Sequence, residues 1–415
     1  MASVVLASCT WGQPAFDSGR SNSNAFEVSL RPDNVGQLEG HVIPSTGSSL
    51  APLVLTVGDS ILIGNFPAGV DAYPANACPR SDNGPCTARW HADGQLLTTD
   101  LTTTFVTAGA TTFAALDSNG APLRTFDTTP APGFGLVAAS VSGPYLLAQL
   151  VKPGPTPTSS DTEEIAVFSR GCSASACTPE RTLSLFSKYG SNFHWAAQDD
   201  VLYAATAGGM SARSLATGTT LWQTNLGVGV GVTDIRLRGG LVYATGGHIY
   251  DAAGIQGCSG NPTICTPVRT LTGAYEVDSI ASTRALDHVI PAGFPLPPSD
   301  IRFWRTDAVG CSGLPLTCDP VARTNPYAAL SDPISTDRLA FTVSTVASIG
   351  NHYHLLAFDL AGIADCTGSP TVCAPLLDLD FSTVQGKPTA ATNGRVYVPT
   401  TDGAVHVFSL PGDVG

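Results

Sequence analysis

Cysteine is the residue type whose spacing in this sequence points most directly to chemistry. Ten of the 11 cysteines fall into five close pairs, and three pairs share one pattern: GCSGNPTICTP, GCSGLPLTCDP and DCTGSPTVCAP. The pairs are Cys78 with Cys86, Cys172 with Cys177, Cys258 with Cys265, Cys311 with Cys318, and Cys366 with Cys373. Such pairs can either form disulfides or bind a metal ion.

A zinc site would need four ligands, with cysteine or histidine side chains supplied in adjacent pairs. Each cysteine pair here stands alone, with no second pair and no histidine beside it. We therefore predict five disulfides, each pinning a loop within its own repeat and contributing at most about 2 to 3 kcal/mol of stability. Because such bonds persist only in an oxidising compartment, we expect the protein to work outside the cytoplasm.

Cys9 is left without a partner by this pairing. It follows Leu6, Ala7 and Ser8, and this stretch resembles the lipobox in which the cysteine of a bacterial lipoprotein becomes the lipidated first residue. Residues 1–6 supply neither the basic nor the apolar region of a secretory signal. Two interpretations remain open: a truncated lipoprotein signal with a lipidated Cys9, or a free cysteine.

A histidine near two carboxylates is the densest polar group in the sequence. His194 is followed by Asp199 and Asp200, and an imidazole beside carboxylates can bind a metal or move protons. We favour a structural interpretation, in which Trp195 begins an inner strand and the two aspartates form the turn after it.

A second group, His352 and His354, occupies alternate positions that share one face of a strand. Two imidazoles on one face can bind a metal, but no third ligand is visible. The pair also falls at a hairpin turn, where solvated histidines are ordinary. We predict no metal site here.

Composition and missing motifs exclude several function classes. The chain has only three lysines among its 20 basic residues, a net charge of −13 and no basic cluster, so nucleic acid is excluded as a partner. No calcium-binding loop of the EF-hand type, no Gly-x-Ser-x-Gly nucleophile elbow and no phosphate-binding glycine loop occurs. No apolar stretch reaches the roughly 18 residues that span a bilayer.

The elements that must position these residues follow from an internal repeat. Its clearest copy is residues 394–412, GRVYVPTTDGAVHVFSLPG, where two alternating apolar runs flank a Thr-Asp-Gly turn and predict an antiparallel hairpin. Eight copies recur about every 48 residues, with further short strands on either side, and predict an all-β, eight-bladed β-propeller of four-stranded blades. We expect the third strands near Val70, Ala114, Val167, Ala212, Ile249, Phe303, Ala357 and Val407.

The last repeat ends after its third strand, so its outer strand must come from elsewhere. Residues 34–43 read like the segment that follows third strands in other repeats. We therefore expect this N-terminal strand to complete the last blade and close the ring. The predicted organisation is a leading segment over residues 1–33 and a single propeller domain over residues 34–415.

The repeats resemble those of the pyrroloquinoline quinone-like (PQQ-like) propeller superfamily. The resemblance is carried by VYVPTTDGAVHVFSLPG and VLYAATAGGMSARSLATGTTLWQTNLG, which combine an apolar strand, a turn rich in Asp or Gly and a Leu-Trp in the outer strand. Residues 11–36 resemble the leading segment of bacterial members, and the cysteine turns resemble those of secreted bacterial subfamilies. The resemblance implies a fold, because this superfold hosts unrelated functions.

Two classes within that superfamily compete. Quinoprotein dehydrogenases hold the quinone in the axial channel against a calcium ion, with a vicinal disulfide and a catalytic aspartate. This chain has no Cys-Cys dipeptide, and its five tryptophans are too few for the regular blade-to-blade docking of those enzymes. We therefore predict the non-catalytic secreted or lipoprotein branch, which resembles the eight-bladed lipoproteins of the outer-membrane β-barrel assembly machinery, with no catalytic residue, cofactor or metal.

The predicted function is that of a scaffold or protein-interaction propeller at the bacterial cell envelope or surface, secreted, periplasmic or lipid-anchored. Its partners would be other envelope or surface proteins, and a lipid on Cys9 would be its only membrane contact. Two proline-rich insertions, residues 152–164 and 291–298, are the loops that we expect to contact a partner. The alternatives are a PQQ- and calcium-dependent dehydrogenase and a surface glycan-binding propeller.

Overall fold

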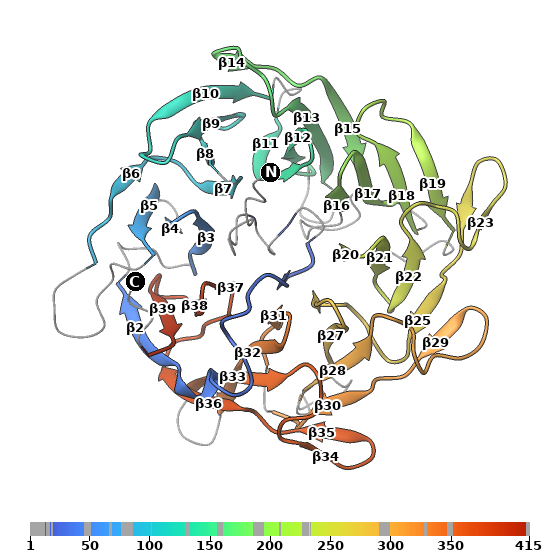
Figure 1. The fold of residues 1–415 in the computed structure, drawn as a ribbon. Coiled ribbons are helices and arrows are strands. Elements are labelled where there is room, and N and C mark those ends of the chain that lie inside the picture. The colour runs from blue at the N-terminus through green and yellow to red at the C-terminus, as the bar shows by residue number, and fades with distance from the viewer. Residues whose placement is uncertain are drawn as a thin grey trace, which may run out of the picture.

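Eight sheets, each with a core of four antiparallel strands, are arranged radially around a central axis in the computed structural model of the chain (Figure 1). The all-β, eight-bladed propeller expected from the repeat is thereby confirmed. The structure describes residues 13, 17, 20–44, 51–65, 69–75, 86–100, 102–128, 133–155, 161–185, 195–206, 209–225, 232, 234–289, 299–327, 330–346 and 352–411.

Blades 1 to 4 follow one another along the chain, each running from an inner strand at the axis to an outer strand at the rim. Blade 1 contains β3 (Leu53–Val57), β4 (Ser60–Asn65), β5 (Gly69–Pro74) and β6 (Trp90–Ala92). Blade 2 contains β7 (Leu96–Thr99), β8 (Thr104–Thr107), β9 (Thr112–Leu116) and β10 (Pro122–Asp127). Blade 3 contains β11 (Gly135–Ser142), β12 (Tyr145–Lys152), β13 (Thr162–Ser169) and β15 (Arg181–Leu185). Blade 4 contains β16 (Trp195–Gln198), β17 (Val201–Thr206), β18 (Gly209–Ser214) and β19 (Thr220–Thr224).

Blades 5 to 8 complete the ring in the same order. Blade 5 contains β20 (Ile235–Arg238), β21 (Leu241–Ala244), β22 (His248–Asp251) and β25 (Arg269–Leu271). Blade 6 contains β26 (Ser279–Ile280), β27 (Arg284–Val289), β28 (Asp300–Arg305) and β30 (Ala322–Thr324). Blade 7 contains β31 (Ile334–Thr336), β32 (Leu339–Val346), β33 (His352–Asp359) and β36 (Leu377–Ser382). Blade 8 contains β37 (Ala390–Thr392), β38 (Arg395–Pro399), β39 (Val405–Ser409) and β2 (Glu39–Ile43).

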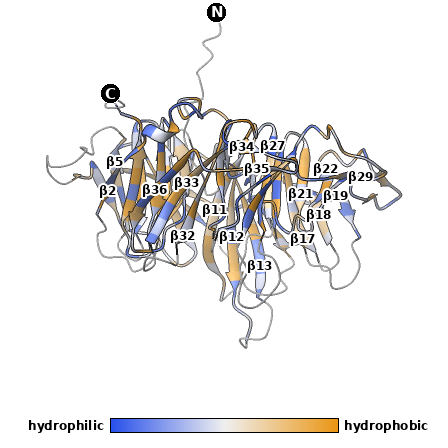
Figure 2. Ribbon diagram, turned by 90° about the horizontal axis from the view of Figure 1, so that it is seen from below, coloured by the Kyte–Doolittle hydropathy of each residue, from blue (hydrophilic) through white to orange (hydrophobic). Residues whose placement is uncertain are grey.

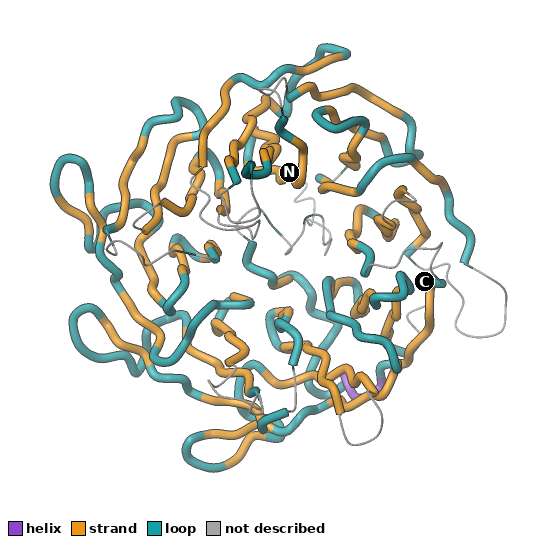
Figure 3. The backbone as a smooth tube through the Cα atoms, turned by 180° about the vertical axis from the view of Figure 1, so that it is seen from behind, coloured by secondary structure: helices purple, strands orange, loops and turns teal. Residues whose placement is uncertain are grey.

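Shorter elements lie outside this four-strand pattern. They are β1 (Ser23–Asn24), β14 (Ala176–Cys177), β23 (Cys258–Ser259), β24 (Ile264–Cys265), β29 (Leu316–Cys318), β34 (Cys366–Thr367), β35 (Thr371–Cys373) and a 3-10 turn, η1 (Val35–Gln37). This turn is the one helical element within the described ranges, where strands and loops otherwise alternate (Figure 3). No helix in those ranges is long and apolar enough to cross a membrane.

Strands near the axis are buried on both faces, because each blade is covered by a neighbour on either side. In β17, for example, the consecutive residues Leu202, Tyr203, Ala204 and Ala205 are all buried. Apolar runs of this kind are expected where both sheet faces pack, and Figure 2 shows apolar residues along the strands of the blades. The outer strand β15 is buried only at Leu183, so it follows a solvated rim.

An N-terminal strand closes the ring, as expected. β2 pairs antiparallel with β39, from Glu39 opposite Ser409 to Ile43 opposite Val405. Blade 8 thus takes its inner three strands from one end of the chain and its outer strand from the other (Figure 1). This pairing occupies two strand edges that would otherwise present unpaired backbone groups.

Four of the predicted cysteine pairs lie at disulfide-bonding distance, and each closes a short turn or hairpin at the rim. They are Cys172–Cys177, Cys258–Cys265, Cys311–Cys318 and Cys366–Cys373. We call these four disulfide-closed segments clasps, because each leaves one blade and pairs with the outer strand of the preceding blade. Three of them, around β23, β29 and β34, project from the rim in Figure 1.

The clasp of blade 5 shows the pairing. Its strand β24 runs parallel to β19 of blade 4, with Gln223 opposite Ile264 and Thr224 opposite Cys265. The same parallel pairing joins β14 to β10, β29 to β25 and β35 to β30. The cysteine spacing predicts loops that are each pinned within their own blade, whereas these loops also bond to the neighbouring blade. An outer strand offers unpaired backbone groups, and the clasp satisfies them.

Two cysteine predictions fall at least partly outside the described residues. Cys86 is disulfide-bonded, but Cys78, its expected partner, lies outside the described ranges. Cys9 also lies outside them, so its lipidation stays a prediction.

Two tryptophans each dock one blade onto the next, although the five tryptophans of the sequence are too few for such docking at every blade. The indole N–H of Trp90 in β6 donates to the carbonyl of Ser118 in blade 2 at 2.9 Å. Trp222 in β19 donates in the same way to Ala252 in blade 5 at 3.1 Å. In each case a turn glycine with positive φ, Gly120 or Gly254, lies against the ring, where a Cβ atom would collide with it.

The outer-strand position that holds Trp90 and Trp222 cannot be recognised from the sequence by tryptophan alone, because other blades have smaller side chains there. Leu183 lies nearest Gly218 at the interface of blades 3 and 4, and Ala322 lies nearest Gly362 at the interface of blades 6 and 7. The position therefore carries no tryptophan in these blades, although the turn and its glycine recur.

Candidate functional site

Residues 20–27, which we call the axial segment, lie at the centre of the ring beside inner strands of blades 5 to 8. Figure 1 shows this part of the chain in dark blue near the axis. Its strand β1 pairs parallel with β31 of blade 7, with Ser23 opposite Ser335 and Asn24 opposite Thr336. The four serine and asparagine residues from 21 to 24 are buried although all are polar. Their burial requires hydrogen-bond partners.

Asn22 makes four of these hydrogen bonds, two through its side chain and two through its backbone carbonyl. Its side-chain amide donates to the carbonyl oxygens of Asp278 and Pro333, at 3.1 and 3.0 Å. Its own carbonyl accepts the backbone N–H of Ser335 at 3.1 Å and the hydroxyl of Ser279 at 2.8 Å. One residue thus connects the axial segment to the inner strands of blades 6 and 7.

The segment also bonds to blade 8. The amide of Asn24 donates to the carbonyl of Ala391 at 3.0 Å. The carboxylate of Glu27, which is fully buried, accepts the backbone N–H groups of Ser29, Leu30 and Gly394 at 2.7, 3.2 and 2.9 Å. Three backbone donors replace the water that this carboxylate loses on burial.

Arg20 connects the segment to blades 4 and 5. Its guanidinium lies 4.6 Å from the centre of the Trp195 ring, which is a cation–π contact. The carbonyl of Arg20 accepts a bond from Arg236 at 2.9 Å, and Arg236 in turn donates to Asp234 at 2.8 Å. Trp195 begins the inner strand β16, as the structural interpretation of that motif predicts.

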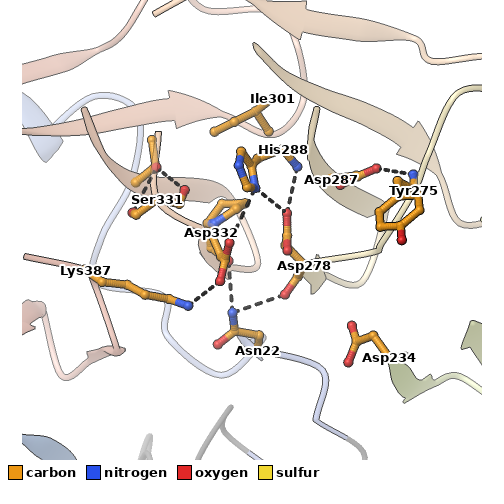
Figure 4. A network of polar contacts seen from close by, with 12 residues as sticks. Asn22, Asp234, Tyr275, Asp278, Asp287, His288, Ile301, Ser331, Asp332 and Lys387 are labelled. Carbon is orange, nitrogen blue, oxygen red and sulfur yellow. Dashed lines mark hydrogen bonds and ion pairs between the residues drawn. The ribbon is translucent and has the colours of Figure 1, made fainter. Parts of the chain in front are cut away.

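Asp278, His288 and Asp332 converge where the inner strands of blades 6 and 7 begin (Figure 4). The imidazole Nδ1 of His288 lies 3.4 Å from an oxygen of each carboxylate. The backbone N–H of His288 donates to Asp278 at 2.7 Å, and the ammonium group of Lys387 contacts Asp332. We call these four residues the Asp–His–Asp cluster.

The cluster is built to hold a positive imidazole. The hydrogen bond and charge of Asp278 raise the pKa of His288 despite burial, so the protonated ring is favoured. Burial raises the pKa of Asp278 itself. Burial, the largest single influence, acts in the same direction on Asp332, but the ammonium of Lys387 and the charges of His288 and Arg236 together outweigh it and lower the pKa of that carboxyl.

These residues are also of the type that binds a cation. One ligand atom from each of Asp278, His288 and Asp332 lies within 4.8 Å of the others. Zinc accepts such imidazole and carboxylate ligands. However, His288 would have to lose its proton, and Lys387 already supplies positive charge to Asp332. The arrangement therefore favours an ion-pair network that anchors the start of two inner strands over a metal centre.

None of the sequence motifs described above contains a residue of this cluster. Asp234, Asp278 and Asp332 each stand one or two positions before an inner strand, in blades 5, 6 and 7 respectively. An aspartate recurring at that position once per repeat is the signal that could have found it. The three residues share no other local motif, so each one alone looks like an ordinary turn aspartate.

Asp287 on β27 is a further buried carboxyl beside the cluster (Figure 4). Burial raises its pKa to about 8, with a smaller contribution from the charge of Asp278. The backbone N–H of Tyr275 donates to it at 2.7 Å. Asp287 is therefore protonated at neutral pH in the folded chain.

The histidine pair on β33 forms two separate ion pairs. His352 bonds to Asp380 at 2.9 Å and His354 bonds to Asp378 at 2.6 Å, both on the adjacent strand β36. No third residue joins either pair to form a possible metal group within the described ranges. Each imidazole thus serves a cross-strand contact.

The remaining sequence candidates are only partly described. His194 lies outside the described residues, and Asp199 and Asp200 form the turn between β16 and β17, as predicted. Of the first proline-rich insertion, residues 156–160 lie outside, and the second insertion, residues 291–298, lies wholly outside. Their role in partner contact stays a prediction.

Comparison of the fold with solved structures places the chain among eight-bladed propellers of different functions. The quinohemoprotein alcohol dehydrogenase from Comamonas testosteroni matches with a TM-score of 0.59 and 10% identity, over 97% of this chain and 81% of that one. BamB from Moraxella catarrhalis matches with a TM-score of 0.53 and 12% identity, over 90% and 99%. A europium-containing methanol dehydrogenase matches with a TM-score of 0.53 and 11% identity, over 97% and 98%.

These identities show a shared fold alone. No protein-family profile and no curated protein sequence matches the chain. The fold resembles both PQQ-type dehydrogenases and BamB. An enzyme and a scaffold can therefore share this fold.

Proposed function

We propose that this chain is a non-catalytic, extracytoplasmic propeller that serves as a rigid scaffold or protein-interaction module at the bacterial cell envelope or surface. The observation that carries the proposal is the axial segment. Its residues 21 to 24 are buried beside the inner strands and bonded to blades 6, 7 and 8. The chain thus supplies its own occupant for part of the axis.

The residues that the structure describes at the axis do not fit a quinone held against calcium, the arrangement implied by the resemblance to quinoprotein dehydrogenases. Asn22 already bonds to two carbonyl oxygens, so its side chain is committed to the fold. The carboxylates of the Asp–His–Asp cluster face a histidine and the ammonium of Lys387, whereas calcium takes several oxygen ligands.

The disulfides support the proposed location. Four cysteine pairs at bonding distance are expected to persist only in an oxidising compartment. BamB, one of the structural neighbours, shares this fold. A lipid on Cys9 would tether the ring to a membrane and leave its blades free for protein partners.

Dye reduction tests the non-catalytic assignment. The purified chain is incubated with PQQ and calcium, and separately with PQQ and europium, and is offered a panel of alcohols and sugars. The proposal predicts no dye reduction above that of a sample without protein. The Comamonas testosteroni dehydrogenase serves as the positive control. Sustained turnover of any substrate would overturn the proposal.

Comparative co-purification tests the interaction role. The chain and a variant with residues 153–161 replaced by a short Gly-Ser linker are recovered after cross-linking in the envelope fraction. We expect a defined envelope protein to be cross-linked to the chain and lost from the variant. Identical recovery from both would remove this loop as the contact site.

A further inference from the structure

A pocket of 510 Å³ lies between blades 1 and 2 and shares no residue with the axial segment. This volume is within the range of roughly 300 to 1,000 Å³ found for small-molecule sites. Its walls come from the turn between β3 and β4, the start of β6, and two turns of blade 2. The residues that matter for its chemistry are Asp59, Arg89, Trp90, Thr104, Ser118 and Asn119.

The described residues that line the pocket carry no net charge. The guanidinium of Arg89 makes two bonds of 2.8 Å to the two oxygens of Asp59, and a third of 3.1 Å to the hydroxyl of Ser60. Among the residues that the structure describes, Asp59 and Arg89 are the only charged ones that line the pocket. An anionic ligand would find its cation already engaged, and a cationic ligand would find its carboxylate engaged, so the pocket favours a neutral ligand.

Its remaining polar side chains have hydrogen-bonding capacity to spare. Within the described ranges, no hydrogen bond engages the side chains of Thr104, Ser118 or Asn119. Their hydroxyl and amide groups both donate and accept. The edges of the Arg89–Asp59 pair add further donors and acceptors. A ligand rich in hydroxyl groups, which also both donate and accept, matches this set.

Trp90 supplies a fixed apolar wall. Its indole N–H is bonded to the carbonyl of Ser118, and Gly120 lies against its ring, so its orientation is set by the docking of blade 1 on blade 2. The ring is half-buried and lines the pocket. A rigid aromatic surface beside convergent polar groups is a common design for small-molecule sites.

We propose that this pocket binds one or two sugar residues of a neutral glycan. A sugar ring presents hydroxyl groups to the polar side chains and C–H groups to the indole, and it carries no charge. The inference adds a ligand class to the proposed scaffold but does not depend on that function. Saccharide binding is measured without PQQ or substrate, so the two proposals can fail separately.

The test is binding to an array of neutral and acidic glycans, followed by titration with the strongest neutral binder. We expect neutral glycans to bind and acidic ones to bind less. Asn119→Ala should weaken the affinity about fivefold to tenfold by removing hydrogen bonds to the sugar. Because this exposed side chain makes no bond within the described fold, the variant should fold normally.

Trp90→Phe gives a second readout, and Trp222→Phe is its matched control. Both substitutions remove an equivalent interblade hydrogen bond, but only Trp90 lines the pocket. We expect Trp90→Phe to weaken glycan binding severalfold and Trp222→Phe to leave it unchanged. The proposal is wrong if no neutral glycan binds, if acidic glycans bind more tightly, or if both pocket variants bind like the unaltered chain.

Discussion

The side-chain amide of Asn22 donates a 3.1 Å hydrogen bond to the backbone carbonyl of Asp278, across 256 residues of sequence. The carboxylate of Asp278 accepts the backbone N–H of His288. The axial segment and the Asp–His–Asp cluster therefore meet at one residue. This contact makes the segment an integral part of the ring, and it is the basis of the functional proposal.

Asn22→Ala tests whether the axial segment stabilises the ring. The change removes both amide bonds and leaves two carbonyl oxygens, of Asp278 and Pro333, without these donors. We expect the free energy of unfolding to fall by about 2 to 4 kcal/mol, measured by urea denaturation. Asn119→Ala, at an exposed position, is the control and should change it by less than about 0.5 kcal/mol. A similarly small effect at Asn22 would show that the segment is only loosely held.

The pKa of Asp287 predicts that stability falls as pH rises. Its carboxyl keeps a proton in the folded chain up to about pH 8, whereas the unfolded chain releases it near pH 4. Between these values the folded state binds more protons, so its stability decreases by up to about 1.4 kcal/mol per pH unit. The raised pKa of His288 acts in the same direction, because its contribution is lost as that ring deprotonates.

Asp287→Asn isolates this contribution, because the amide does not titrate and still can accept from Tyr275. Chemical denaturation of both proteins between pH 5 and pH 8 should give a shallower slope for the variant. Parallel slopes would show that Asp287 is ionised in the folded chain.

The clasp of blade 5 can be opened by replacing both Cys258 and Cys265 with serine. We expect a loss of at most about 2 to 3 kcal/mol of stability. The backbone N–H of Gln223, which donates to Thr263 at 3.0 Å, should exchange with deuterium faster because its partner strand is released. The N–H of Thr125, bonded to Ser175 in the intact clasp of blade 3, is the internal control. Unchanged exchange at Gln223 would mean that the disulfide does not hold this pairing.

The docking of Trp222 predicts that replacing two glycines of similar φ, Gly254 and Gly310, by alanine reduces stability by different amounts. A Cβ atom at Gly254 would lie 2.3 Å from the Trp222 ring. A Cβ atom at Gly310 would have no other atom within 4 Å. Both residues have positive φ, at +68° and +87°. We expect Gly310→Ala to cost about 1 kcal/mol from backbone strain and Gly254→Ala at least about 2 kcal/mol more, because the ring must move. Equal melting temperatures for the two variants would argue against the dock.

The sequence was sufficient to predict the architecture, because each repeat contains the strand and turn pattern of one blade. The third strands lie where residues such as Val167 and Ala357 indicate, and residues 34–43 contain the strand that closes the ring. These features are local or periodic, so each one leaves a pattern in a single repeat. The cysteine turns were visible for the same reason.

The axial segment and the Asp–His–Asp cluster were not visible in this way. A stretch of serine and asparagine such as residues 21–24 has no apolar periodicity, and its burial depends on partners that lie hundreds of residues away. His288 and Asp332 likewise come from different blades. Contacts that depend on how the ring closes have no local signature, whereas the repeat that builds the ring does.

Titration of the chain with PQQ in the presence of excess calcium tests the central proposal most directly. If the axial segment replaces a cofactor, isothermal titration calorimetry should detect no stoichiometric binding to the chain. The Comamonas testosteroni enzyme, stripped of its quinone, should bind under the same conditions. Tight binding of one PQQ per chain would contradict the account and restore the dehydrogenase alternative.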